Sequence, residues 1–290
     1  MSTSTPPYTT GTLTSADDTT IGYRKLGSGP GVVLLSAGFL AAQHYMGLAE
    51  ALSDAFTVYV MDRRGRGLSG PPGDRYSMAR ECKDVEALLA ATGARLVFGH
   101  SSGALVALRA ALTLPQVDKV AVYEPPLSEH SSIPTSWIPR FDREVALGKP
   151  AAALVTFVKA DNLVPAYLPR WLFVPLIALY FGWEKRTVRL PDVPMEDLVP
   201  LQRFDGLLVE EMDSSLQTFA GMSAEVLLMG GQRSPAFLRE ILDALEGTLP
   251  RVKRVEFKGV GHEAPHDRGS PERVGEELRA FFADALLDGW

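Results

Sequence analysis

The chain has 290 residues, of which 46% are hydrophobic and 22% charged, as is typical of a globular protein rather than a disordered or fibrous one. Its formal net charge is −6 and its basic residues are scattered, so no nucleic-acid partner is expected. Cys82 is the single cysteine, which excludes an intramolecular disulfide and offers no metal cluster. The first residues lack the basic and apolar regions of a secretion signal, so we expect a cytoplasmic protein.

The N-terminal half of the chain alternates predicted strands with predicted helices. Two early segments alternate polar with apolar side chains, and two later ones are continuous apolar runs, as in parallel strands covered on both faces. The predicted strands are 8–13, 20–25, 32–36 and 56–62, and the predicted helices are 43–55 and 78–91. This order predicts an α/β fold with a mostly parallel sheet.

The stretch from Leu96 to Val106 carries the strongest functional signal. An apolar run ends at Gly99, Ser101 stands between Gly99 and Gly103, and a helix-like run follows. A serine hydroxyl is exposed on such a sharp turn only if its neighbours lack bulky side chains. The turn also places Ser101 at a helix N-terminus, where free N–H groups favour a developing negative charge. We therefore predict that Ser101 is a nucleophile; the alternative is a structural turn.

This strand–turn–helix segment resembles the nucleophile elbow of the α/β-hydrolase family. The resemblance implies an eight-stranded, mostly parallel sheet with helices on both faces and a helical cap inserted after the sixth strand. It also implies that the loop at 62–70, which resembles the family's Asp-x-x-Gly-x-Gly-x-Ser turn, is a rigid turn beside the site. Its three arginines are therefore expected to be structural rather than anion-binding.

The resemblance further implies an oxyanion hole built from backbone N–H groups. In most of the family a His-Gly pair follows the strand at 32–36, and the next residue donates one N–H group. Here Ala37 replaces the histidine and Gly38 is retained, so Phe39 becomes the candidate donor. Ser102, which follows the nucleophile, is the second candidate.

The C-terminal half contains a long segment without strand patterns. Residues 118–126 predict a strand that ends at Glu124, and strand patterns return only at residue 224. We therefore expect a core of residues 1–126 and 223–290 with a helical cap at 127–222. The remaining predicted elements are strands at 224–231 and 251–259 and helices at 235–246 and 271–287.

Aromatic residues are frequent in the predicted cap. Since a cap excludes water and shapes a pocket, the expected lining is Trp137, Phe141, Trp171, Phe173, Tyr180 and Trp183. The apolar run from Trp171 to Trp183 is interrupted by Pro175 and is too short to span a bilayer. We expect a helix packed on the core, without stable membrane insertion.

A serine nucleophile needs an imidazole base, and the imidazole needs a carboxylate to orient it. Of the five histidines, His262 follows the last predicted strand, where the resemblance places the catalytic histidine. His266 is the reserve candidate. His100 directly precedes Ser101, and we expect it to point away from the base.

The usual position of the family's acid is empty in this chain. The loop that follows the strand at 224–231 has no carboxylate, so Glu124 is the predicted acid, as it is in the zearalenone-degrading lactone hydrolases that this feature resembles. Neighbouring parallel strands end at one edge of a sheet, which brings Glu124 towards His262. The alternatives are an ion pair between Glu124 and Arg233, with Asp161 or Glu263 as the acid.

These residues predict a serine hydrolase that cleaves a carboxylic ester or lactone of a moderately large apolar small molecule through an acyl-enzyme. No cofactor and no metal are expected, because protein groups fill every role. One alternative is a non-hydrolytic or carbon–carbon bond-cleaving enzyme of secondary metabolism on the same fold. The other is a non-catalytic small-molecule receptor.

Overall fold

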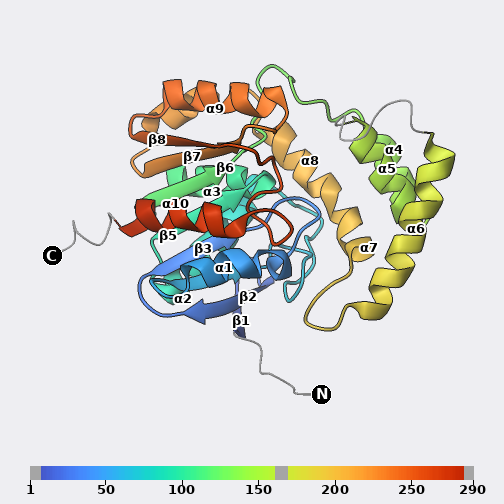
Figure 1. Ribbon diagram of the computed structural model, residues 1–290, viewed down its shortest axis with the longest axis horizontal. Helices are drawn as coiled ribbons and strands as arrows, with labels where there is room; N and C mark the ends of the chain where they lie inside the picture. The colour runs from blue at the N-terminus through green and yellow to red at the C-terminus, as the bar shows by residue number, and fades with distance from the viewer. Residues whose placement is uncertain (1–7, 161–168, 284–290) are drawn as a thin grey trace.

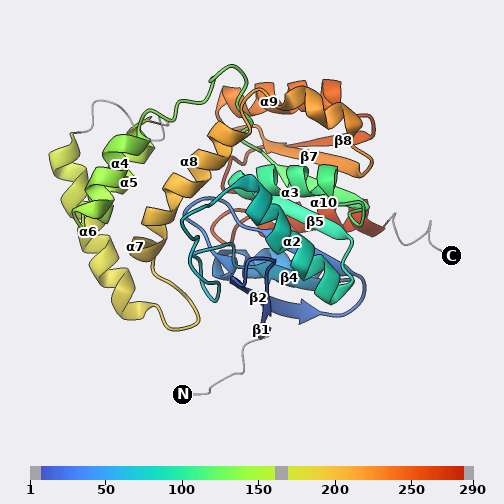
Figure 2. The same ribbon diagram turned by 180° about the vertical axis from the view of Figure 1, so that it is seen from behind.

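The computed structural model describes residues 8–160 and 169–283. Within these residues an eight-stranded sheet has the order β1-β2-β4-β3-β5-β6-β7-β8 (Figures 1 and 2). β2 pairs antiparallel with β1 and β4, and the other neighbours are parallel. The strands are β1 (Thr9–Thr14), β2 (Thr20–Gly27), β3 (Gly31–Leu35), β4 (Thr57–Met61), β5 (Leu96–His100), β6 (Lys119–Tyr123), β7 (Glu225–Gly231) and β8 (Val252–Phe257).

Helices cover both faces of the sheet. In β3, Val33 and Leu35 join one apolar cluster with α2, α3 and α9, while Val32 and Leu34 join a second cluster with α1 and α10. Successive strand residues point to opposite faces, which explains why the parallel strands are continuous apolar runs. These helices are α1 (Met46–Leu52), α2 (Met78–Thr92), α3 (Ser102–Thr113), α9 (Ala236–Thr248) and α10 (Pro271–Ala283), with the 3₁₀ helix η1 (Ala42–Tyr45) before α1.

Residues 127–222, the cap segment, lie between β6 and β7 and form helices but no strand in their described part. The helices are α4 (Ile138–Ala146), α5 (Pro150–Ala160), α6 (Arg170–Thr187), α7 (Met195–Leu198), η2 (Val199–Leu201), α8 (Gln202–Glu211) and η3 (Leu216–Gly221). A separate apolar cluster, centred on Trp137, Phe141 and Phe157, holds α4, α5 and α6 together. Figures 1 and 2 show α6 at the outer edge and α8 between it and the sheet.

The predicted fold class is confirmed: the sheet is eight-stranded and mostly parallel, with helices on both faces and further helices between β6 and β7. The single helix predicted at 43–55 is instead the 3₁₀ helix η1 followed by α1, which ends at Leu52. The terminal helix is described as far as Ala283, and its predicted extension to residue 287 lies outside the described residues. None of the described helices combines the length and apolar character needed to cross a bilayer.

Candidate active site

Ser101 occupies a strained turn between β5 and α3. Its φ of 54° and ψ of −122° belong to a region that non-glycine residues rarely adopt. The flanking glycines are required by crowding. A Cβ at Gly99 would lie 2.3 Å from the carbonyl oxygen of Gly103, and a Cβ at Gly103 would lie 2.6 Å from that of Leu35. The G-x-S-x-G pattern therefore has a steric cause in this structure.

Glu124, directly after β6, contacts both β7 and the loop after β8 that carries His262, which we call the histidine loop. The carboxylate is fully buried, with one oxygen 2.6 Å from His262 Nδ1 and the other accepting the Gly231 N–H at 2.6 Å. Gly230 leaves room for it, since a Cβ there would lie 3.2 Å from Glu124 Oε1. A carboxylate bound at Nδ1 leaves Nε2 of His262 as the basic nitrogen. The ion pair with Arg233 that was the alternative for Glu124 is not formed.

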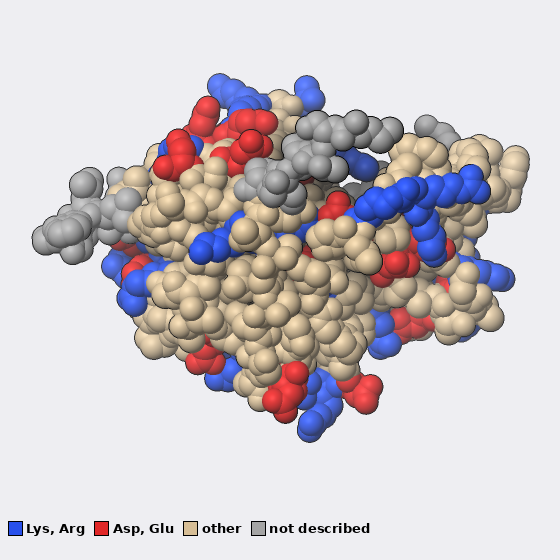
Figure 3. Space-filling model, turned by 90° about the horizontal axis from the view of Figure 1, so that it is seen from below, with Lys and Arg blue, Asp and Glu red and all other residues tan. Residues whose placement is uncertain are grey.

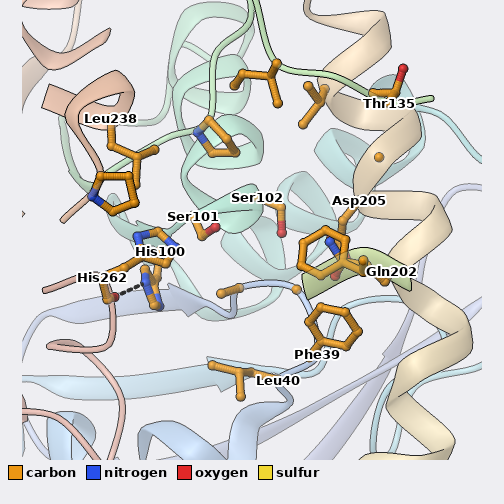
Figure 4. Close-up of a pocket in the computed structure, with 18 of the residues that line it drawn as sticks. Phe39, Leu40, His100, Ser101, Ser102, Thr135, Gln202, Asp205, Leu238 and His262 are labelled. Atoms are coloured by element: carbon orange, nitrogen blue, oxygen red, sulfur yellow. Dashed lines mark hydrogen bonds between the residues drawn. The ribbon is translucent and has the colours of Figure 1, made fainter. Parts of the chain in front are cut away.

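The two residues expected to donate to the oxyanion line the same cavity as Ser101. Phe39 follows β3 with a φ of 58°, and Ser102 is the first residue of α3. The first N–H groups of a helix have no intrahelical acceptor, so the Ser102 N–H is available to a ligand. Phe39, Ser101, Ser102 and His262 line one cavity (Figure 4).

His100 does not point away from the base, so that expectation is wrong. Its Nε2 lies 2.8 Å from the main-chain oxygen of His262, the bond dashed in Figure 4, and the two rings are 4.8 Å apart. Alternation along β5 places His100 on the same face as Phe98, the face covered by α1 and α10, where the histidine loop also arrives.

The protonation of His100 follows from its partners. A carbonyl oxygen only accepts, so Nε2 donates to His262, and Nδ1 accepts from the Tyr45 hydroxyl at 2.7 Å. The same hydroxyl accepts the Ala37 N–H at 2.9 Å. Burial, and next the neighbouring His262, hold the pKa of His100 well below its usual range, so the ring is neutral. These bonds join the His262 loop to the strand end that precedes Phe39.

The cavity has a volume of about 370 Å³ and mainly apolar walls. Two residues of α8, Gln202 and Asp205, form a polar wall on the cap side (Figure 4). Gln202 is buried, and its Oε1 has no hydrogen-bond partner among the described residues. The sequence prediction missed this wall. Polar residues three apart share one side of a helix, but α8 also carries Arg203, Glu210 and Glu211, so this spacing alone does not single out Gln202 and Asp205.

Of the aromatic residues expected in the pocket, Trp137 lines the cavity and the others do not. Phe141 is fully buried within the cap segment, Phe173 and Tyr180 are half-buried, and Trp171 and Trp183 are exposed. An aromatic residue on a cap helix lines the pocket only if it lies on the side of the helix that faces the pocket. The number of aromatic residues in the segment does not show which side each one occupies. Phe157, which was not predicted, does line the cavity.

Asp205 connects the polar wall to the loop after β4. It accepts hydrogen bonds from Arg63 at 2.9 Å and Arg66 at 2.8 Å. Arg63 also donates to Ser102 Oγ at 3.0 Å and pairs with Glu81 at 3.1 Å. Burial opposes ionisation of Asp205, but Arg66 and Arg63 outweigh it and lower the pKa of the carboxyl. Arg63 and Arg66 form ion pairs with carboxylates of the protein, which agrees with a structural role.

The reserve candidates have other positions. His266 and Glu263 both line the cavity, and Glu263 accepts the Gly261 N–H at 3.3 Å. Asp161 lies outside the described residues.

Comparison with known proteins places the chain among hydrolases. The pimeloyl-[acyl-carrier protein] methyl ester esterase of Xanthomonas campestris pv. campestris (strain B100) is 27% identical over 266 residues, 89% of this chain and 97% of that protein. An alpha/beta hydrolase structure from Sphaerobacter thermophilus DSM 20745 is 30% identical with a TM-score of 0.76, covering 94% of this chain and 100% of that one. An esterase from Rhodococcus sp. ECU1013 shares the fold, with 19% identity, a TM-score of 0.70 and coverage of 94% and 98%.

A sequence model of the alpha/beta hydrolase family matches residues 32–277, which span the elbow, the cap segment and the histidine loop. This protein is therefore a member of the α/β-hydrolase family.

Proposed function

We propose that this enzyme is a serine hydrolase that cleaves a carboxylic ester or a lactone. The contact between Glu124 and His262 carries the proposal, because it leaves Nε2 of His262 as a base in the cavity that Ser101 also lines. Family membership and the esterase named among the relatives support ester hydrolysis. We assign the nucleophile to Ser101, the base to His262 and the orienting acid to Glu124.

The proposed reaction has two halves. His262 takes the proton of the Ser101 hydroxyl while the oxygen attacks the carbonyl carbon, and the N–H groups of Phe39 and Ser102 bind the resulting oxyanion. The intermediate collapses by breaking the bond to the leaving alcohol, which takes the proton from His262. Water then attacks the acyl-enzyme with His262 as base, and Ser101 leaves with the proton. Glu124 stabilises the imidazolium in both halves.

The cavity supports an uncharged, mainly apolar substrate. Its volume of about 370 Å³ suits a moderately large small molecule, and most of its walls are apolar. The charges behind the polar wall are balanced, since Arg63 and Arg66 face Glu81 and Asp205. A charged substrate group would find no unpaired counter-charge there. The proposed reaction needs no cofactor, because groups of this chain supply the nucleophile, base, acid and oxyanion donors.

A fluorophosphonate probe and p-nitrophenyl esters test the proposal in the wild type and in Ser101→Ala. We expect the substitution to abolish labelling and to lower turnover at least about 10³-fold, because the attacking oxygen is removed. Ser53→Ala, in the turn after α1, is the matched control and should label like the wild type. Labelling of Ser101→Ala would contradict the assigned nucleophile.

Two further outcomes would favour the other roles of this fold. A folded wild type that binds apolar ligands but neither labels nor turns over esters would favour a receptor. Ester hydrolysis in oxygen-18 water places the label in the product acid, so products of carbon–carbon cleavage or of transfer without that label would favour a non-hydrolytic enzyme.

A further inference from the structure

Helix α6 carries a continuous apolar face on the outside of the cap segment. Trp171, Leu179 and Trp183 are 76%, 73% and 61% exposed, and the exposed Leu172 and Leu176 lie between them. Steps of four, three and four residues place Leu172, Leu176, Leu179 and Trp183 on one side of the helix, and Trp171 lies at the edge of that side, in the first turn. Single exposed leucines are ordinary, but a contiguous group of large apolar side chains indicates an interaction surface.

The opposite face of α6 is packed against the protein. Ile177 and Phe181 contact the apolar cluster of the cap segment that contains Trp137 and Phe141. Glu184, the only acidic residue of α6, is also on this side and is buried, accepting hydrogen bonds from the Tyr180 hydroxyl at 3.2 Å and the Met195 N–H at 2.8 Å. The exposed face of α6 therefore carries no acidic side chain.

Basic residues stand at the C-terminal end of this face. Arg186 is exposed and forms no ion pair with any residue in the described part of the chain, whereas Lys185 pairs with Glu196 at 3.3 Å. The end of the molecule that carries α6 lies at the right of Figure 3, where the surface is mostly tan with blue and red side chains beside it. Tryptophans near both ends, leucines between them and a cation at one end are typical of a helix that lies in a membrane interface.

We propose that α6 docks this enzyme reversibly on an anionic lipid surface. The face from Trp171 to Trp183 enters the boundary between headgroups and acyl chains, and Arg186 meets the lipid phosphates. The positive charge of Arg186 favours an anionic lipid surface over a second copy of the chain, because a second copy would bring its own Arg186 to the same interface. Docking of this kind is adsorption and not a membrane span.

Vesicle co-sedimentation tests the proposal with phosphatidylcholine vesicles that contain or lack phosphatidylglycerol. We expect the wild type to prefer the anionic vesicles. The double substitution Leu176→Ser/Leu179→Ser should weaken binding at least about tenfold, because it removes two large apolar contacts. Arg186→Glu should weaken binding to the anionic vesicles about tenfold and change binding to the neutral ones little.

Matched controls lie on other surfaces. Leu147→Ser removes a leucine that is 62% exposed after α4, and Lys83→Glu reverses a charge on α2 that is 57% exposed. Neither should change vesicle binding. Bromine-labelled lipid tails should quench wild-type tryptophan fluorescence, because Trp171 and Trp183 lie in the docking face, and the double variant should lose most of this quenching.

Three results would overturn the proposal: a wild type that binds neither vesicle, a double variant that binds anionic vesicles as tightly as the wild type, or controls that weaken binding equally. A fourth is a lipid-free dimer, detected by light scattering, that Leu176→Ser/Leu179→Ser converts to a monomer, since that would assign the face to a second copy. Circular dichroism confirms that each variant is folded. Binding is measured without turnover, so its outcome is separate from that of the proposed reaction.

Discussion

The loop after β4 buries charged side chains, whereas the outer face of α6 exposes large apolar ones. Both are unusual, because charged residues are normally exposed and large apolar residues normally buried. Arg63, Arg64 and Arg66 are completely buried, whereas Trp171 and Leu179 are among the most exposed large apolar residues. Each buried arginine has carboxylate partners within the protein, so its charge is satisfied internally. The exposed apolar face of α6 has no such partner among the residues that the structure describes. The comparison agrees with a structural role for the arginines and with the docking role that we propose for α6.

Among these substitutions, replacing a buried arginine is expected to lower the free energy of unfolding most. Arg63→Met leaves Glu81 and Asp205 buried without this partner, so we expect it to lower the free energy of unfolding by about 3–5 kcal/mol. The control Arg95→Met breaks the exposed pair with Asp118 and should cost about 1 kcal/mol or less. Urea unfolding measures both. Equal losses would show that the buried cluster is not the stabilising element that the comparison requires.

The two faces of α6 give the next largest difference. Phe181→Ala empties a buried position in the cap segment and should destabilise the protein by about 3–5 kcal/mol if the cap unfolds together with the core. Leu179→Ala, two residues away on the exposed face, should change stability by less than about 0.5 kcal/mol. Thermal unfolding compares them, and a similar loss for Leu179→Ala would mean that its face is already covered by protein.

The unpaired amide oxygen of Gln202 leads to a smaller expected change in stability, and of opposite sign. A buried carbonyl oxygen without a partner costs free energy, so Gln202→Leu should raise stability by about 1 kcal/mol. Gln43 is the matched control, because its amide exchanges two hydrogen bonds with the main chain of Val193 at 2.8 and 2.7 Å. Gln43→Leu should therefore be destabilising in the same urea experiment. A loss of stability in Gln202→Leu would imply an additional partner for this amide.

Local sequence patterns together with the family resemblance sufficed to predict the fold, and they named the three residues of the proposed triad. The buried strands are apolar runs with a fixed period, and the elbow needs glycines on both sides of Ser101 for a steric reason that the sequence displays. Glu124 was predicted because the usual acid position lacks a carboxylate and because the family resemblance allows an acid after this strand. The shared edge of the parallel strands β5, β6 and β7 made its approach to His262 plausible.

The remainder of the site depends on tertiary packing. The orientation of His100 depends on which face of the sheet the histidine loop covers. Neither the hydrophobic pattern of the sequence nor the spacing of its motifs shows which face that is. The aromatic residues of α6 were expected in the pocket, but Trp171 and Trp183 lie on the side of the helix that faces away from the protein. Asp205 joins Arg63 and Arg66 across a long separation in sequence, so the link between cap and core is visible only in the structure.

Glu124, directly after β6, is the proposed acid of the triad, and Glu124→Gln tests this assignment most directly. We would measure kcat/KM for a p-nitrophenyl ester in the wild type, Glu124→Gln and Glu124→Ala, with Glu263→Gln as the control for the other carboxylate at the cavity. We expect kcat/KM to fall about 10⁴-fold in both Glu124 variants in folded protein, and far less in Glu263→Gln. Glu124 variants that stay within about tenfold of the wild type, or a larger loss in Glu263→Gln, would contradict it.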